Sequence, residues 1–234
     1  MNNELAVTVL IGAPGTNGHR IFNRIVNDDR QARVTAIAPW PRSKATQEHS
    51  GLTLVRTTER LKRLGRGCSC CTVRADVLTK VRQIAEGKTA DEVVIQVPPR
   101  SDLDALAKTF SVADEQGRVL GDVAYVDRVV TVVDGSTVLS VNESSMSQRL
   151  VELIRTADVV WVDGAAALAS EQRAEVLEVV GVINPEAQIL EGDDGEILLS
   201  KFQVEASNDP TPDLLALDAP DSLEFAPSSV LPVR

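Results

Sequence analysis

Cys68, Cys70 and Cys71, which are all the cysteines of the 234-residue chain, lie within four consecutive positions. Thiolates are ligands that borderline-soft ions such as Zn²⁺ prefer. The spacing of Cys68 and Cys70 lets both bind one ion, whereas Cys71, directly after Cys70, need not face it. A helix predicted to begin near Thr72 would lower the pKa of these thiols and favour thiolates. The alternative is three small buried hydrophobic side chains at a strand-to-helix turn.

The sequence does not identify a fourth metal ligand. Candidates are His19, His49, Asp76, solvent or a second subunit, and the oligomeric state is left open. The first residues lack the basic and apolar regions of a secretory signal, so we expect a cytoplasmic protein. In that compartment an odd, clustered set of cysteines indicates metal binding or redox chemistry rather than a disulfide framework.

Composition excludes several function classes. The net charge is −10, and an acidic surface repels phosphate backbones, so we expect no nucleic-acid partner. The longest apolar runs, such as Val129–Val133, have the length of a strand and are far too short to span a membrane. Hydrophobic residues make up 43% of the chain but aromatic residues only 3%, which predicts a globular core of aliphatic side chains.

Predicted strands and helices alternate along the chain. The predicted strands are Leu5–Ile11, Arg33–Ala38, Leu52–Val55, Glu92–Val97, Ala124–Val133, Asp158–Val162 and Ala187–Leu190. Apolar residues recur at helical spacing from Ile21 and from Leu103 onward. The same spacing covers Thr72–Glu86, Gln148–Thr156 and Ser170–Val180, so helices are predicted in all of these segments. This alternation predicts an α/β fold: a mostly parallel sheet with helices on both faces. Ligands of such folds bind beyond the carboxyl ends of the strands, here in the loops after Ile11, Val97, Val133 and Val162.

The chain is predicted to divide at residue 204. Residues 1–204 form the α/β domain, whereas 205–234 hold five prolines, six acidic residues and one basic residue. Such a tail cannot form a core of its own. We expect it to be mobile or to lie on the surface, and its leucines could dock on a partner protein.

Residues Gly67–Val77 read Gly-Cys-Ser-Cys-Cys-Thr-Val-Arg-Ala-Asp-Val. This segment resembles the G-C-x-C-C-t-x-R-x-D-l motif of CobW-type GTPases, P-loop metallochaperones related to hydrogenase- and urease-maturation GTPases. A glycine-rich loop after the first strand, Arg128–Asp134 and Asn184–Ile189 match further family landmarks in order. The resemblance implies a P-loop NTPase (CobW-like) fold from about Leu5 to Phe202, and zinc or cobalt as the metal. It also implies that Asp134 is architectural.

The nucleotide motifs depart from the family pattern. A working P-loop reads G-x-x-x-x-G-K-[ST], with a lysine for the phosphates and a hydroxyl for Mg²⁺. Here Gly12, Gly15 and Gly18 remain, but His19 takes the lysine position and Arg20 the hydroxyl position, with one residue inserted. Arginine cannot ligate Mg²⁺. These five residues could form at most a residual anion site, so GTP with Mg²⁺ is a doubtful cofactor.

Three further elements differ. Gln96-Val97-Pro98-Pro99-Arg100 replaces the family's E-x-x-G segment, Val162-Asp163-Gly164-Ala165 replaces the guanine-reading N-K-x-D, and Ala38-Pro39-Trp40-Pro41 replaces an N-E-x-G loop. We also expect the family's separate C-terminal domain to be absent. Together these changes predict a P-loop fold without GTPase chemistry and hence no catalytic residues.

Three functional hypotheses follow. The first is a metal-binding protein of the metallochaperone type, which holds or delivers zinc or cobalt to a client protein without hydrolysing GTP. The second is a pseudo-GTPase kept as a structural or regulatory subunit of a complex, with the 205–234 tail as a docking segment. The third is an active GTPase that uses His19 and Arg20 unconventionally.

Overall fold

The computed structural model describes residues 4–16, 18–26, 33–38, 52–56, 79–111, 113, 116–140 and 147–192. For His19, 24–26 and 52–56 only the backbone is described. All of these residues belong to one unit, Met1–Leu199, whereas the second unit, Ser200–Arg234, lies outside the described ranges. The predicted tail 205–234 lies there too, so the division at residue 204 stays a prediction.

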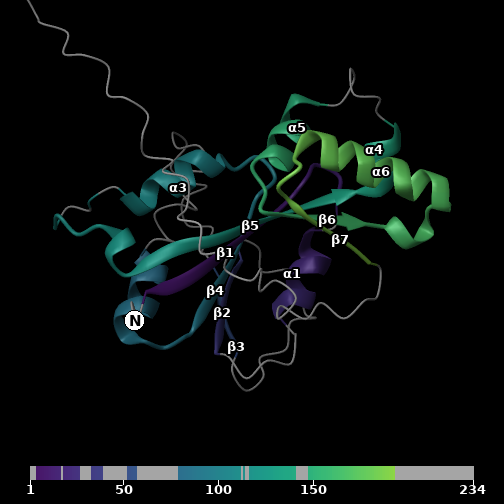
Figure 1. Ribbon diagram of the computed structural model, residues 1–234. Coiled ribbons are helices and arrows are strands. Elements are labelled where there is room, and N and C mark those ends of the chain that lie inside the picture. The colour runs from purple at the N-terminus through teal and green to yellow at the C-terminus, as the bar shows by residue number, and fades with distance from the viewer. Residues whose placement is uncertain are drawn as a thin grey trace, which may run out of the picture. The chain divides into compact units, whose positions relative to one another are not determined.

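Seven strands form one sheet in the order β3-β2-β4-β1-β5-β6-β7 (Figure 1). They are β1 (Leu5–Gly12), β2 (Val34–Ala38), β3 (Leu52–Arg56), β4 (Glu92–Val97), β5 (Ala124–Asp134), β6 (Val159–Asp163) and β7 (Gln188–Glu191). Every pairing is parallel. Each strand agrees with a predicted run to within one residue at either end, because β-branched residues suit a pleated backbone buried on both faces. The predicted fold class is confirmed.

Helices cover both faces of this sheet. They are α1 (Gly18–Val26), the helical segment 79–87, α3 (Leu103–Ser111), α4 (Gly135–Ser140), α5 (Gln148–Arg155) and α6 (Ser170–Ile183). Figure 1 shows α1 on one side of the sheet and α4, α5 and α6 on the other. The segment 79–87 confirms the described part of the predicted helix Thr72–Glu86. No helix in the described ranges is long and apolar enough to cross a bilayer.

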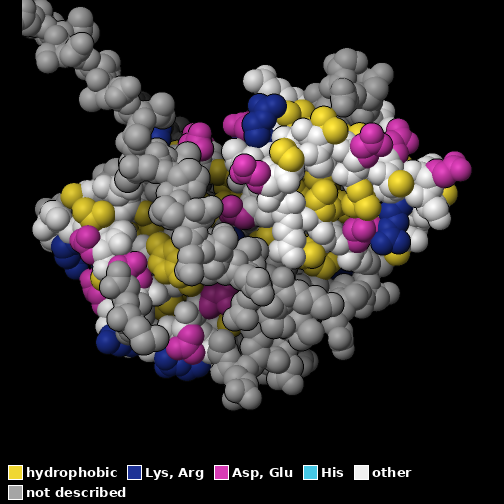
Figure 2. All heavy atoms as spheres, viewed as in Figure 1, with side chains coloured by type: hydrophobic (Ala, Val, Ile, Leu, Met, Phe, Trp, Pro, Cys, Tyr) yellow, Lys and Arg dark blue, Asp and Glu magenta, His cyan; other side chains and the backbone are white. Residues whose placement is uncertain are grey.

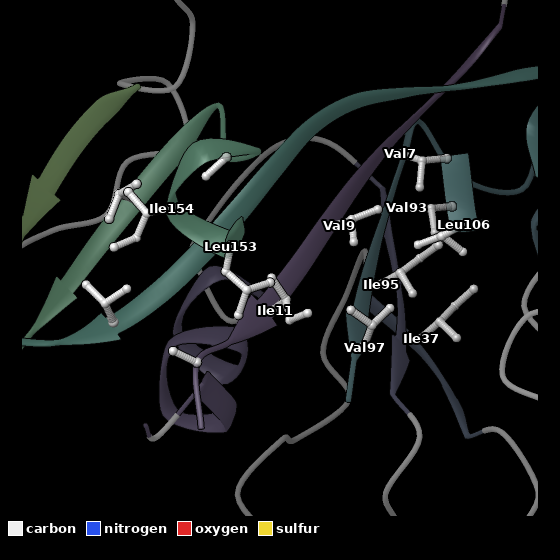
Figure 3. Close-up of a cluster of buried hydrophobic side chains, with 14 of the residues drawn as sticks. Val7, Val9, Ile11, Ile37, Val93, Ile95, Val97, Leu106, Leu153 and Ile154 are labelled. Carbon is white, nitrogen blue, oxygen red and sulfur yellow. The ribbon is translucent and has the colours of Figure 1, made fainter. Parts of the chain in front are cut away.

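The main core lies on the face opposite α1. Alternate residues of β1, namely Val7, Val9 and Ile11, are fully buried there with Leu106 of α3 and Leu153 of α5 (Figure 3). Alternation along a strand sends Leu10 to the other face, where its Cδ2 lies 3.9 Å from the place a Cβ would take on Gly18. Trp161 of β6 is also buried, with 2% of its surface exposed.

Helix α4 was not predicted from the sequence. Gly135, Ser136 and Thr137 are poor helix formers, so only a loop was expected after Val133. The carboxylate of Asp134 nevertheless starts a helix: Oδ1 accepts from the main-chain N–H of Thr137 at 2.8 Å and from Ser136 Oγ at 2.5 Å. This is N-cap geometry, in which a side chain satisfies a helical N–H without an intrahelical partner. The architectural role of Asp134 thus has a structural basis.

The side chain of Asn184 joins the ends of α5 and α6 to the start of β7. Its amide contacts three carbonyl groups at the end of α5 and two N–H groups ahead of β7. Nδ2 donates to the oxygens of Ile154 (2.9 Å), Arg155 (3.2 Å) and Ala157 (2.8 Å), and Oδ1 accepts from Glu186 (3.2 Å) and Ala187 (3.1 Å). Asn184 is 9% exposed, and its side chain supplies partners to main-chain groups that are shielded from water. The Ile154 oxygen also accepts from the N–H of Ala157 at 3.3 Å, and the N–H of Ala187 also contacts the Asn184 carbonyl oxygen at 3.4 Å. The Asn-Pro landmark is therefore a structural element.

Candidate functional site

The candidate site lies at the carboxyl edge of the sheet, where the Gly12–Gly18 loop follows β1. The neighbouring strand β5 ends at Asp134, which pairs in register with Asp163 at the end of β6. Two carboxylates therefore end adjacent strands beside this loop. The edge is the one the sequence predicted for ligand binding, because parallel strands present their carboxyl ends together.

The loop folds into a tight turn. The N–H and Oγ1 of Thr16 both donate to the carbonyl oxygen of Ala13, at 3.1 and 2.7 Å. Gly15 has a φ of 90°, a conformation that glycine adopts without strain. Gly12 and Gly18 nearly touch, since a Cβ on Gly18 would lie 3.1 Å from the Gly12 Cα. The glycines that suggested a phosphate loop here allow the backbone to close on itself.

Three residues of this loop offer no free backbone donor to a phosphate. The N–H of Ala13 donates to the Val132 carbonyl oxygen at 2.8 Å, Pro14 has no N–H, and the N–H of Thr16 is used inside the turn. A P-loop binds phosphates through backbone N–H groups of this loop. His19 lies in the first turn of α1, but its side chain is outside the described atoms, so its predicted role stays a prediction.

Arg20 forms an ion pair with Asp163. Its Nη2 lies 2.5 Å from Oδ1 of Asp163, and the two side chains are 45% and 13% exposed. The pair joins the first turn of α1 to the end of β6, across 143 residues of sequence. The residue predicted at the Mg²⁺-ligand position therefore contacts a residue of the segment predicted to replace the guanine-reading motif. Sequence reasoning identified both substitutions but not their contact.

A cavity of about 60 Å³ lies beside the loop, lined by Ala13, Pro14, Thr16, Val133, Asp134, Thr137, Ser147 and Leu150. Burial opposes ionisation of Asp134, but the hydrogen bonds from Ser136 and Thr137 outweigh it and lower the pKa of Asp134. The carboxylate is thus charged at neutral pH. Cavities that hold small-molecule ligands measure roughly 300 Å³ or more, so this cavity, bounded by described residues, is of a size for water.

The three cysteines lie outside the described residues, as does His49. Within the described ranges, no group of three His, Cys, Asp or Glu side chains is arranged to hold a metal ion. Acidic and basic side chains are interspersed over the described surface seen in Figure 2. The metal site predicted at Cys68, Cys70 and Cys71 therefore stays a prediction based on the cysteine motif.

Comparisons with solved structures support the fold. Zn(II)-bound YjiA GTPase from E. coli superposes with a TM-score of 0.58 at 18% identity, covering 86% of this chain and 61% of that one. A Zn(II)-bound triple mutant of YjiA, with one glutamate and two cysteines replaced by alanine, gives 0.59. FtsY from Mycoplasma mycoides gives 0.55 at 13% identity, covering 84% of this chain and 63% of that chain.

Sequence comparison gives a relative and a family. The zinc-regulated GTPase metalloprotein activator 1 of Dictyostelium discoideum is 27% identical over 228 residues, which cover 85% of this chain. The match covers 48% of the relative, so this chain spans about half of its length. The family model of the CobW/HypB/UreG nucleotide-binding domain matches residues 6–191. The chain therefore belongs to the CobW/HypB/UreG family.

Proposed function

We propose that this protein binds zinc, or cobalt, through Cys68, Cys70 and Cys71 and handles the ion for a client protein without hydrolysing GTP. The family, the zinc-regulated activator and the zinc-bound YjiA structures support the metal-handling part. Three clustered thiols are a donor set that suits a borderline-soft ion. The ion would be cargo rather than a resident cofactor.

The observation that carries the proposal against GTP hydrolysis is the ion pair between Arg20 and Asp163. A hydrolysing P-loop places a hydroxyl on Mg²⁺ at the position of Arg20. A guanidinium has no acceptor atom and stays protonated, so it cannot ligate Mg²⁺. Its contact with Asp163 also ties the guanidinium to a carboxylate, so that its charge is already compensated by a protein group rather than by a phosphate. The residues present therefore do not fit Mg²⁺-GTP.

The zinc-bound YjiA triple mutant bears on the experiment. Two cysteines were replaced in that protein and zinc is still bound. Zinc in a preparation of the present protein would therefore not by itself assign the metal to the cysteines. The test has to change the chain's own thiols and measure the loss of metal.

The test is elemental analysis of protein purified without an affinity tag. We expect near-stoichiometric zinc or cobalt in the parent protein and none after Cys68→Ser combined with Cys70→Ser. Ser69→Ala, between the two thiols, is the matched control and should keep the metal. Absence of metal from the parent protein, even after anaerobic reconstitution, would contradict the proposal, and so would full metal content in the double variant.

A GTPase assay on the same samples tests the second part of the proposal. We expect phosphate release at the background rate, and no rise in melting temperature when Mg²⁺ and GTP are added, because a ligand stabilises only a fold that binds it. Turnover that Arg20→Ala abolishes would instead identify an active GTPase.

The second candidate function is a pseudo-GTPase that serves as a structural or regulatory subunit. The closed Gly12–Gly18 loop supports it as well, because the same hydrogen bonds would make a stable scaffold of a former nucleotide domain. This candidate needs a partner protein that co-purifies with the full chain and is lost when residues 205–234 are deleted. Such a partner, bound to a metal-free parent protein, would favour this candidate over metal handling.

A further inference from the structure

The loop after β4, Pro98–Asp102, differs from the corresponding loop of a nucleotide-responsive domain, as the Gly12–Gly18 loop does. In GTPases, segments at this edge order when backbone and side-chain groups contact the γ-phosphate and Mg²⁺, and they are released on hydrolysis. Such a segment needs free backbone N–H groups and two accessible conformations. Residues Pro98–Asp102 have few such N–H groups, and hydrogen bonds hold the loop at its far end.

The backbone of this loop has few donors available. Pro98 and Pro99 have no N–H, and their rings fix φ near −65°. The N–H of Ser101 donates to the Pro98 carbonyl oxygen at 2.9 Å and closes a turn. Among residues 98–102, the N–H groups of Arg100 and Asp102 are not used in this way. The loop therefore has little with which to detect a phosphate.

The far end of the loop is held by helix α3. Asp102 is its N-cap: Oδ1 accepts from the N–H of Ala105 at 2.9 Å, and its carbonyl oxygen accepts from Leu106 at 3.1 Å. Leu106 is 7% exposed and belongs to the main core. Movement of the loop would thus unwind the first turn of α3 and withdraw a core side chain.

Arg149 connects the loop to a different crossover. From the first turn of α5, its Nη2 donates to the carbonyl oxygen of Ser101, a residue that is 7% exposed. Its Nη1 lies 3.0 Å from Oε2 of Glu152, one turn along the same helix, which orients the guanidinium. A charged donor to a buried carbonyl makes a stronger hydrogen bond than a neutral pair, and its loss leaves that carbonyl without a partner.

We propose that Arg149 clamps the Pro98–Asp102 loop to α5, so that this edge of the sheet keeps one conformation whether or not nucleotide is present. The inference rests on the proposed function, because it explains how metal handling can proceed without a nucleotide cycle. Pro99 and Arg100, both exposed at the tip, would then be presented in a fixed arrangement. Arg149 acts as a positioning residue.

Hydrogen exchange of the intact protein, read by mass spectrometry on peptides covering 98–106, tests the clamp. We expect the Ser101 and Ala105 amides to be protected in the wild type and to exchange at the same rate with Mg²⁺ and a non-hydrolysable GTP analogue. Arg149→Ala should raise their exchange by about tenfold or more, the effect of losing a charged hydrogen bond. Arg149→Lys, which keeps the charge but loses the planar fork, should give an intermediate rise.

Arg155→Ala, in the last turn of α5 and exposed, is the matched control and should leave the exchange unchanged. The clamp is wrong if these amides are unprotected in the wild type, or if both Arg149 variants exchange like the wild type. A nucleotide-induced change in wild-type exchange would also overturn it. Phosphate release and metal content of the same preparation report separately on the proposed function, so that failure of one is distinguishable from failure of the other.

Discussion

Asn184 gives the sharpest test of how this domain is held together. Its amide contacts three carbonyl groups and two N–H groups. An NH₂ group has two hydrogens, so the three carbonyl contacts amount to two full hydrogen bonds, and Oδ1 adds two more. At about 1 kcal/mol net for each bond, the total is roughly 4 kcal/mol. Some of the carbonyls can regain water, so Asn184→Ala should lower the free energy of unfolding by about 3 kcal/mol.

Urea denaturation measures this loss directly. In thermal unfolding of a domain of this size, a loss of about 3 kcal/mol corresponds to a fall in melting temperature of roughly 6–12 °C. Gln148→Ala, an amide-to-alanine change at the exposed start of α5, is the control and should stay within about 0.5 kcal/mol of the wild type. A cost below about 1 kcal/mol for Asn184→Ala would refute the argument, because the five contacts would then contribute no more than one ordinary hydrogen bond.

Asn184→Asp distinguishes the contacts of Nδ2 with the carbonyl oxygens from the contacts of Oδ1 with the N–H groups. The carboxylate keeps the acceptor for the two N–H groups but faces the three carbonyl oxygens with a negative charge. Its pKa should therefore be raised in the folded state, and stability should be lost as the pH rises through that pKa. We expect the variant to be as unstable as Asn184→Ala at pH 7 and to recover part of the difference in acid. No recovery relative to the wild type would contradict the assignment of the amide orientation.

Four further substitutions each test a single residue. Gly181→Ala should stabilise the protein by about 0.5–1 kcal/mol, because no described atom lies within 4 Å of the added Cβ. Gly15→Ala should destabilise it by about 1 kcal/mol, because Gly15 has a φ of 90°. Urea denaturation measures both changes in the free energy of unfolding. Burial raises the pKa of Asp158 in the folded state, so the wild type loses stability as the pH rises from 3.8 through that raised pKa. Asp158→Asn should therefore be more stable than the wild type at pH 7. Thermal unfolding below pH 3.8 should show no gain of the variant over the wild type. Arg20→Gln should cost about 1 kcal/mol through its half-exposed pair with Asp163, and added salt should shrink the difference in melting temperature from the wild type.

The strands were predictable because their signal is local. Runs of valine such as those in β5 and β6 favour buried parallel strands. The short helix α4 was missed because its residues are poor helix formers and the capping carboxylate of Asp134 was not used as a start signal. Aspartate three residues before Thr137 is a pattern that would have identified it.

The contacts that define the candidate site were beyond the reach of sequence reasoning. Arg20 meets Asp163 across 143 residues, and Arg149 meets Ser101 across 48. Such contacts depend on where the sheet order places the ends of distant strands, and no local spacing encodes that. The cysteine motif shows the opposite case: its chemistry can be read from residue types alone, whereas its geometry lies outside the described residues.

The sheet order also has a consequence for how the chain acquires its structure. β1 lies between β4 and β5, with Ala6 beside Glu92 and Leu5 beside Ala124. Both neighbours come much later in the sequence, so the apolar strand β1 is synthesised long before the strands with which it pairs. Folding dominated by such distant pairings is slow and leaves hydrophobic segments exposed to aggregation. During synthesis, β1 can pair with β4 only after the ribosome has released residues 92–97, so β1 stays without its sheet neighbours over that interval.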